Sequence, residues 1–422
     1  MRPTRARFQV SGFLFLLAAV TYLDRVCIST LAPEISRDLG LSKLQMSFVF
    51  SAFAVAYAGF EVFSAWWGEK IGARRVLARI VVWWSVFTMA TAGAWNYSSL
   101  VAIRFLFGAG EAGAWPNAAL ALSRWIPQRE RGRVQGFFFA AAHVSGGLTP
   151  LLVAWLLTLL PWRGVFLVCG CFGVVWAAAW YRWFRDEPRE HPKANQAEVE
   201  LIESGRQLGG HAHHGAALWR ALARSPNVWC LCLAYHSNSY GSYFVMTWLP
   251  TYLAENRGFE KQSLSLFAGL PLLLSVFGDI SGGAVTDWAI RAFGLRLGRV
   301  VVCVVGYAVA AVAMLAAVYA NTPVMAACLI AVAVAASMFT LSPSWAACMD
   351  IGGKNTAVLS AAMNTTGQVG SILSPVITGW IVYRFSNWQM PLLIMAGLYA
   401  LSAVLWTQVD PRKRLDAGPP AA

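Results

Sequence analysis

Charged side chains are scarce in this sequence. Only 13% of its 422 residues are Asp, Glu, Lys or Arg, whereas 58% are hydrophobic. A soluble globular domain usually carries about 25% charged residues, so this chain has too little charge to cover a surface that faces water. Apolar runs of about 20 residues recur along the whole length, which is typical of helices that cross a lipid bilayer. The composition therefore predicts an all-α integral membrane protein.

Patterns for disulfides, metals and catalysis are also lacking. The eight cysteines all fall inside apolar runs, and the two pairs spaced i,i+2 do not face each other on a helix, so we interpret them as packing residues. His211, His213 and His214 lie in a polar stretch, where a solvated loop is the simplest prediction. No nucleophile–base constellation or cofactor fingerprint is present. We therefore predict no enzyme activity, no metal and no cofactor.

Twelve apolar segments are long enough to span a bilayer. They lie at residues 8–31, 44–67, 75–95, 98–126, 134–160, 163–184, 227–254, 262–290, 298–320, 322–349, 356–384 and 388–409. Most connections are short, but the stretch after the sixth segment is long and polar. We predict an N-terminal six-helix bundle over residues 1–184, a cytoplasmic central loop over 185–226, and a C-terminal six-helix bundle with a cytoplasmic tail over 227–422.

The net charge of +13 is unevenly distributed. Most lysines and arginines fall in connections on one side of the predicted membrane, together with both termini and the central loop. The positive-inside rule makes that side cytoplasmic. The basic excess therefore reflects topology, and we predict a protein of the cytoplasmic (inner) membrane that binds no nucleic acid.

The fourth segment, AIRFLFGAGEAGAWPNAALALSRW at 102–125, carries Arg104 and Glu111 well inside its apolar run. Arg104 and Glu111 are seven residues apart, so they share one helix face with ~10.5 Å of rise between them. A charge at mid-membrane depth costs ~2.5–3.5 kcal/mol even on a mild scale, so such residues indicate a functional site. The alternative is a buried pair that only holds helices together.

Small residues surround this acid. Gly108, Gly110 and Gly113 are expected to let neighbouring helices approach closely. Pro116 lacks a backbone N–H, which predicts a kink just after Glu111.

The first segment contains Asp24 and Arg25, within YLDR at 22–25. Adjacent residues point about 100° apart on a helix, so only one of them can face the fourth segment while the other serves a neighbour. A planar guanidinium suits capture of a carboxylate or phosphate, and a carboxyl group in a low dielectric can exchange a proton near neutral pH. These residues predict an anion site next to a proton site. The alternative is a self-neutralising Asp–Arg pair.

Two stretches repeat between the halves, WGEKIGARR at 67–75 and GAVTDWAIR at 283–291. Each places an acid at a helix end with basic residues beyond it, and such a group can clamp a gate. The predicted gate residues are Glu69, Arg74, Arg75, Asp287 and Arg291. Ordinary stop-transfer charge would explain the arginines but not the repeated acids.

The chain resembles transporters of the major facilitator superfamily, and within it the anion:cation symporters that include hexuronate, galactonate and glucarate permeases. The matching stretches are YLDR at 22–25, SAFAVAY at 51–57, GEKIGARR at 68–75, RFLFGAGEAGAWPN at 104–117, SRWIPQRERGR at 123–133, MTWLPTYL at 246–253 and MNTTGQVGSILSPVITG at 363–379. The resemblance implies two six-helix bundles around a central cavity, working by alternating access.

The resemblance also implies residue roles. By this resemblance, proton coupling falls to Asp24, Glu111 and Arg104. Its substrate-binding positions are Arg25 for the carboxylate, Tyr57 as its partner, and Ser342, Ser344, Trp345 and Asn364 for sugar-acid hydroxyls. Two departures stand out: the fifth segment has Ala142-His143 where sugar-acid permeases often have glutamine, and the gate motif has Glu69-Lys70 in place of Asp-Arg.

Further polar residues sit in predicted spans. His143 is a candidate binding residue or a structural hydrogen-bonding one, and Tyr243 is predicted to contact a substrate hydroxyl. Asp279 is a candidate second titrating group or counter-charge. For Glu61 and Asp350 we favour roles at a gate or interface.

We predict a monomeric secondary transporter that imports a small organic anion, such as a hexuronate or aldonate, by proton symport. One alternative is an organophosphate:phosphate antiporter of the same fold. That site should carry one cavity arginine per half, and in the second half Arg299 and Arg384 lie only at the ends of predicted spans. Another alternative is a transporter-like sensor that binds its ligand without moving it.

Overall fold

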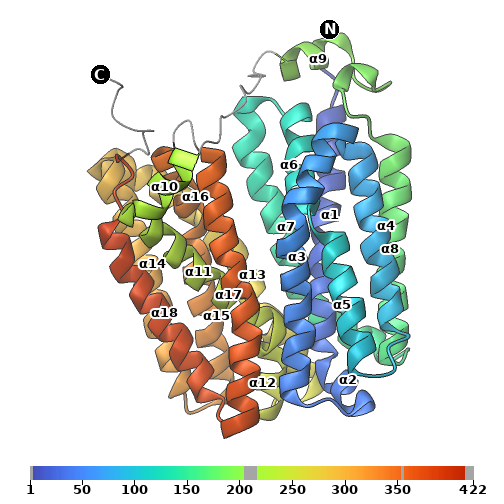
Figure 1. The fold of residues 1–422 in the computed structure, drawn as a ribbon, viewed down its shortest axis with the longest axis vertical. Helices are drawn as coiled ribbons and strands as arrows, with labels where there is room; N and C mark the ends of the chain where they lie inside the picture. Colours follow the sequence, from blue (N-terminus) through green and yellow to red (C-terminus); the bar gives the residue numbers. More distant parts are fainter. Residues whose placement is uncertain (1–2, 204–215, 353–355, 414–422) are drawn as a thin grey trace. The chain divides into compact units, whose positions relative to one another are not determined.

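The computed structural model describes residues 3–203, 216–352 and 356–413, and every regular element in those ranges is a helix. The chain divides into two compact units, Met1–Gly209 and Gly210–Ala422. Unit 1 contains α1 (Ala6–Thr30), α2 (Ala32–Leu39), α3 (Lys43–Ile71), α4 (Ala73–Thr91), α5 (Tyr97–Glu111), α6 (Ala114–Trp125), α7 (Gln128–Leu156), α8 (Trp162–Trp183), η1 (Pro188–Glu190) and α9 (Gln196–Glu203). Unit 2 contains α10 (Ala216–Arg224), α11 (Pro226–Thr247), α12 (Leu249–Glu255), α13 (Lys261–Phe293), α14 (Leu295–Val318), α15 (Pro323–Phe339), α16 (Leu341–Gly352), α17 (Thr356–Phe385) and α18 (Gln389–Gln408) (Figure 1).

Eight helical stretches in the described residues are long and apolar enough to cross a membrane. They lie in α1, α3, α7, α8, α13, α14, α15 with α16, and α18. The four other predicted spans correspond to α4, to α5 with α6, to α11 with α12, and to α17. Large apolar side chains on the outer faces, such as Phe277 and Val312, are exposed, as expected where lipid is the solvent. The prediction of an all-α membrane protein is confirmed.

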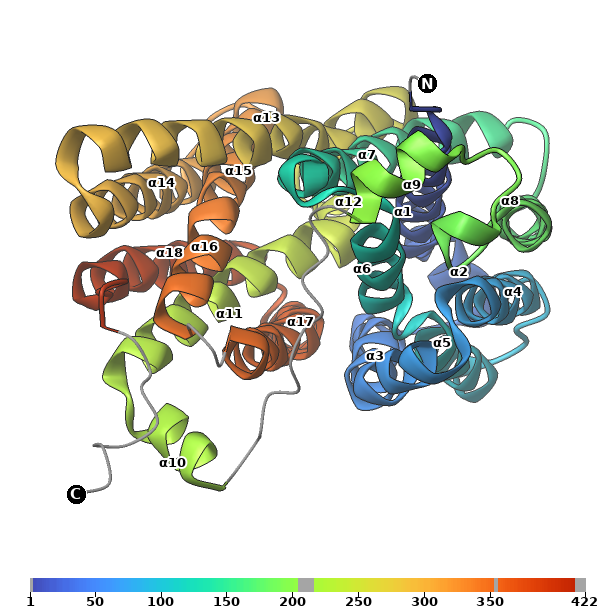
Figure 2. The ribbon, with the colours of Figure 1, turned by 90° about the horizontal axis from the view of Figure 1, so that it is seen from above.

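Both units pack their helices in the same order. In unit 1, α1 packs against α7, α4 against α8, and α3 against α5. In unit 2, the corresponding pairs are α11 with α17, α14 with α18, and α13 with α15 (Figure 2). The chain therefore contains a structural repeat, in which each half buries the same helix faces against one another.

The fourth predicted span is broken after Glu111. Gly113 has φ of +87°, which an L side chain rarely adopts, and a Cβ on it would lie 2.3 Å from the Ser64 Cβ. Pro116 has no N–H to give to the carbonyl of Ala112, so one helical hydrogen bond is missing here, which together with Gly113 favours the break. The predicted kink is confirmed, and it is a complete interruption between α5 and α6.

A matching interruption occurs in unit 2. Helix α15 ends at Phe339 and α16 begins at Leu341, with Thr340 between them. Pro343 lies three residues after Thr340, just as Pro116 lies three residues after Gly113. The repeat thus extends to the position of the helix break.

Part of the predicted central loop is helical and packed on unit 1. Glu198 of α9 is fully buried, and its carboxylate accepts hydrogen bonds from the backbone N–H groups of Ala6 and Arg7, each at 3.2 Å. It also pairs with the Arg7 guanidinium at 3.1 Å. An acid at the start of α1 satisfies N–H groups that have no partner within the helix and is favoured by the helix dipole. The three histidines at 211, 213 and 214 lie outside the described residues.

Candidate functional site

The central contact of unit 1 joins Arg25 on α1 to Glu111, the last residue of α5. Arg25 Nε donates to Glu111 Oε1 at 2.6 Å, and Arg25 Nη2 also pairs with that oxygen. The Arg25 side chain is 11% exposed and that of Glu111 is completely buried. Removing one partner of a buried ion pair typically costs about 3–5 kcal/mol, because the other charge is left uncompensated. The structure thus brings together the predicted anion-binding arginine and a predicted proton-carrying acid.

Aromatic rings hold the Arg25 guanidinium in position. Its central carbon lies 5.0 Å from the ring centroid of Phe53, 5.0 Å from that of Tyr57 and 5.9 Å from that of Tyr22. Contacts of a cation with ring faces are favourable, especially away from water. Tyr57, which the resemblance pairs with Arg25, is buried with its ring against the guanidinium.

Gly108 allows this arrangement. A Cβ at Gly108 would lie 2.4 Å from the backbone oxygen of Phe53, so only glycine lets α5 approach α3 this closely. Gly110 and Gly113 are equally tight, against Trp83 and Ser64. The prediction that these three glycines permit close helix packing is confirmed.

Asp24 turns away from Arg25 toward α4. It lies beside Trp84 and Thr88, is 1% exposed, and interacts electrostatically with Glu111 and Arg104. Neither of its carboxylate oxygens makes a hydrogen bond of standard geometry within the described residues. A buried carboxylate without such bonds is costly when ionised, which favours a group that binds a proton. The adjacent residues therefore serve different helices, as their 100° separation predicts.

Arg104 is buried on α5, two helical turns before Glu111. Its guanidinium carbon lies 4.3 Å from the Phe107 ring centroid and 5.4 Å from that of Phe53. It interacts electrostatically with both Glu111 and Asp24. Arg104 therefore contributes a positive charge that influences both acids.

An aromatic wall continues from Tyr22 to α6 and α7. The His143 ring is buried and meets the Tyr22 ring edge-on, with centroids 5.5 Å apart. Trp115 meets Tyr22 at 6.2 Å and stacks on Phe139 at 5.4 Å. His143 thus lies one ring away from Arg25, and Trp115 is a neighbouring residue that the sequence did not single out.

Two of the unit 2 residues that were predicted to contact substrate hydroxyls donate hydrogen bonds to backbone carbonyls. Ser342 donates to the carbonyl of Asp279 at 3.3 Å, and buried Ser344 donates to the carbonyl of Thr340 at 2.6 Å. The first bond joins α16 to α13, and the second lies at the start of α16, where the Ser344 N–H donates to the same carbonyl at 3.1 Å.

The other predicted contacts in unit 2 are half-buried. Trp345 meets the Tyr235 ring edge-on with centroids 5.9 Å apart. Tyr243 lies on α11, where its carbonyl accepts the Thr247 hydroxyl. Asn364 lies on α17, which packs against α11.

The predicted gate residues of unit 1 meet an acid that the sequence did not single out. The Arg74 backbone N–H donates to Asp186 Oδ1 at 3.2 Å, and Arg124 pairs with the same oxygen at 3.4 Å. The Arg74 guanidinium donates to the Tyr181 carbonyl at 2.9 and 2.7 Å. Arg75 is exposed, and the side chain of Glu69 lies outside the described part of the chain. Asp186 follows α8, more than 100 residues from Arg74, so only the fold brings the two together.

In unit 2, the predicted gate pair makes a local contact. Asp287 and Arg291 are both exposed on α13, and Arg291 donates to the backbone carbonyl of Asp287 at 3.2 Å. A more buried ion pair of unit 2 joins Arg299 to Asp350 at 2.7 Å. Asp350 therefore serves an interface between α14 and α16, in line with the role favoured for it.

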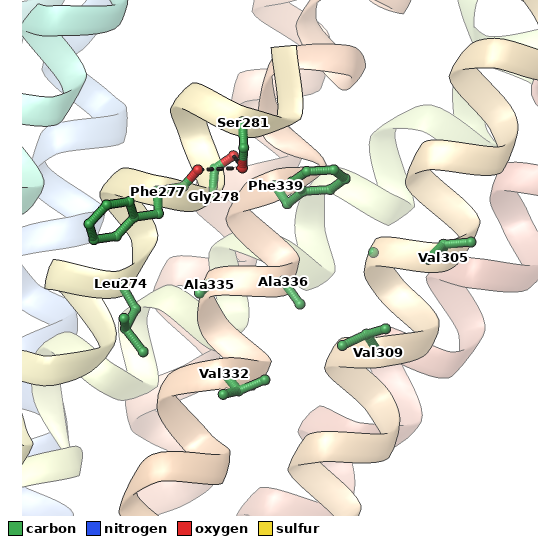
Figure 3. A pocket seen from close by; sticks show the side chains of 11 residues that line it. Leu274, Phe277, Gly278, Ser281, Val305, Val309, Val332, Ala335, Ala336 and Phe339 are labelled. Atoms are coloured by element: carbon green, nitrogen blue, oxygen red, sulfur yellow. Dashed lines mark hydrogen bonds between the residues drawn. The ribbon is translucent and has the colours of Figure 1, made fainter. Parts of the chain in front are cut away.

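Unit 2 also contains an apolar groove of about 420 Å³ between α13, α14 and α15 (Figure 3). Phe277, Val309 and Phe339 line it, and its polar side chain, Ser281, bonds to the Phe277 carbonyl of its own helix. A groove of this chemistry cannot hold an anion, since it offers no charge or donor directed at a ligand. Among the described residues, the chemistry for an anion lies in the buried group of unit 1.

Two repeated sets of membrane-spanning helices with charges buried among them are typical of integral membrane transport proteins. The chain belongs to the Major Facilitator Superfamily, whose family model matches residues 14–375 and 295–421.

Several curated transporters are similar over almost their whole length. The chain is 32% identical over 414 residues to the "Probable sulfoacetate transporter SauU" of Cupriavidus necator, covering 98% of this chain and 96% of that protein. It is 29% identical over 420 residues to the "Probable galactarate/D-glucarate transporter GudP" of Bacillus subtilis, covering 96% and 91%. It is 27% identical over 423 residues to the "Probable L-galactonate transporter" of Escherichia coli K12, covering 98% and 93%.

A solved structure supports the fold. A bacterial homologue of the human lysosomal transporter Spinster matches with a TM-score of 0.79 at 17% identity, over 100% of both chains.

Proposed function

We propose that the protein is a secondary active transporter that imports a small organic anion together with protons, by alternating exposure of one site to the two sides of the cytoplasmic membrane. The observation that carries the proposal is the buried pair of Arg25 with Glu111, with Asp24 and Arg104 close enough to influence it. An arginine held by an acid can bind a substrate carboxylate only when that acid gives it up. Protonation of Glu111 provides this release, which couples the proton to the anion.

In the proposed cycle, Glu111 and Asp24 take up protons and Arg25 binds the anion from outside. Tyr57 and His143 flank the anion, while Tyr243, Ser342, Ser344, Trp345 and Asn364 of unit 2 contribute contacts to the rest of it. Opening to the inside lets the acids lose their protons, and Arg25 returns to Glu111 as the anion leaves. The gate residues Glu69, Arg74, Arg75, Asp287 and Arg291 are proposed to hold one conformation closed, with both termini in the cytoplasm.

The named substrates of the relatives support a choice of anions. Sulfoacetate and glucarate carry two acid groups, and galactonate carries one. The first relative is the most identical of these three, so sulfoacetate joins the sugar acids as a candidate substrate.

The test is uptake of labelled sulfoacetate, D-glucarate, L-galactonate and a hexuronate by proteoliposomes containing the purified protein. Saturable accumulation that requires an inward pH gradient, and persists without sodium, supports the proposal. Uptake that requires internal phosphate instead supports an organophosphate antiporter. Saturable binding without flux supports a sensor.

A further inference from the structure

Glu61 shares a face of α3 with two residues that hold Arg25. Phe53, Tyr57 and Glu61 are each four residues apart, so they follow one another at ~6 Å of helix rise. The Arg25 guanidinium carbon is 5.0 Å from the ring centroids of both Phe53 and Tyr57. Glu61 is half-buried and interacts electrostatically with Arg25. Its position beside Arg25 differs from the gate or interface role that the sequence favours.

The internal repeat marks the same position in unit 2. Glu61 precedes the gate acid Glu69 by eight residues, and Asp279 on α13 precedes Asp287 by eight. Both are half-buried acids on the second long helix of their unit. The charge of Arg25 acts on Glu61 within unit 1, and Asp279 occupies the same position of the repeat in unit 2, so the two acids form a matched pair for experiment.

Arg25 pairs directly with Glu111 of α5, and its charge also acts on Glu61 of α3. With Asp24 and Arg104 they form a group of three acids and two arginines, whose net charge is −1 when all five are ionised. In the proposed cycle Asp24 and Glu111 are protonated when the anion arrives, so Glu61 is the acid of this group that is still ionised. The bound anion and the Glu61 carboxylate repel each other, and two like charges 4 Å apart repel by ~4 kcal/mol at an effective dielectric constant near 20. Proton uptake by Glu61 removes this repulsion.

We propose that Glu61 takes up a proton when an anion binds to Arg25, so that each anion is accompanied by one more proton than Asp24 and Glu111 provide. The inference rests on the proposed function and adds a residue to its coupling. Anions with two acid groups benefit most, because each brings two negative charges to the site.

Other charged groups lie nearer to the helix ends. Those on the helices packed against α3, and on α3 itself, are Glu34, Arg37, Asp38, Lys43, Glu69, Lys70, Arg74, Arg75, Arg79, Arg104, Glu111 and Arg124. Arg104 and Glu111 belong to the group described above. Arg25 is the group whose charge acts on Glu61 most directly.

The experiment measures how many protons accompany binding. The KM for sulfoacetate uptake into proteoliposomes is determined from external pH 5.5 to 7.5 at fixed internal pH, for the full-length protein and for Glu61→Gln, Glu61→Asp and Asp279→Asn. By linkage, the slope of log KM against pH gives the number of protons taken up with the anion. We expect Glu61→Gln to lower this slope by about 1, a tenfold smaller change in KM per pH unit, while Glu61→Asp and Asp279→Asn keep the wild-type slope.

An unchanged slope in Glu61→Gln overturns the inference. An equal loss of slope in Asp279→Asn also overturns it, because Asp279 belongs to unit 2 and Arg25 to unit 1. A purely structural role would lower the amount of folded protein or the maximal rate without changing the slope. If Glu61→Gln does not fold, Glu61→Met keeps a similar side-chain volume without a titratable group and is measured in its place. Failure of the wild-type protein to take up any anion would instead refute the proposed function.

Discussion

The two units share a packing scheme but differ in the charge that they bury. Five residues before the proline of the helix break, unit 1 has Glu111 and unit 2 has Met338. Unit 2 nevertheless forms the same break before Pro343 and packs its helices in the same order. The fold therefore does not need a charge at this position. The comparison favours a functional reason for burying Glu111, because a purely structural pair would be expected to recur where the structure recurs.

Loss of the buried arginine should have very different effects on transport in the two units. Arg25→Ala is expected to reduce sulfoacetate or D-glucarate uptake at least ~100-fold, because a charge-assisted bidentate contact is worth about 3 kcal/mol or more. Arg299→Ala, which breaks the pair with Asp350 in unit 2, should keep anion binding within about threefold while lowering thermal stability. Binding and uptake are measured with purified protein and proteoliposomes. Normal uptake by Arg25→Ala would remove the site assignment.

Glu111 and Asp350, the acids that pair with Arg25 and Arg299, provide the second contrast. Glu111→Gln should lose accumulation driven by a pH gradient while exchange of labelled for unlabelled anion continues, since an amide cannot carry the proton. Asp350→Asn should still accumulate anion under the gradient. Both are measured in the same vesicles. Gradient-driven accumulation by Glu111→Gln would show that the coupling lies elsewhere.

Replacing a glycine at a close helix contact should destabilise either unit to a similar extent. A Cβ at Gly108 would lie 2.4 Å from the Phe53 carbonyl, and one at Gly278 would lie 2.4 Å from the Ala335 carbonyl. Gly108→Val and Gly278→Val should each destabilise the protein by about 1–3 kcal/mol or more, because backbone must move apart. Thermal unfolding in detergent measures the loss. A stable Gly108→Val protein with normal uptake would mean that the close approach of α3 and α5 is dispensable.

The smallest effect is expected at the end of α18. The Arg412 guanidinium beside Asp410 lowers the pKa of that carboxyl to about 2. A lowered folded-state pKa stabilises the protein above the ordinary value near ~3.9, and that stability is lost as the pH falls toward 2. Asp410→Asn should therefore cost about 0.2–1 kcal/mol at neutral pH and nothing near pH 2. Melting temperatures at pH 3 to 7 test this, and a constant difference would contradict it.

Much of the fold followed from local sequence. Long apolar runs predict membrane helices because each span must bury its backbone polar groups in a helix, and Pro116 marks the break because it removes a specific hydrogen bond. The members of the buried charge group, Asp24, Arg25, Arg104 and Glu111, were equally visible, since a charge inside an apolar run is expensive wherever it points.

Other features depend on residues far apart in the chain. Asp186 meets Arg74 and Arg124 across the end of unit 1, and Glu198 caps the start of α1 from within the predicted loop. Neither contact leaves a local pattern, because any acid in a polar stretch looks solvated until its partner is known.

By itself, the sequence determined the membrane class, the family and which residues bury charge, because hydropathy and helical period act over a few turns of chain. The tertiary structure decided that Arg25 pairs with Glu111, that Asp24 faces α4, and that the charge of the same arginine acts on Glu61. Those outcomes depend on which faces of separate helices meet. Ionic interactions weaken with distance, so the identity of the partner, and with it the chemistry, exists only in the folded chain.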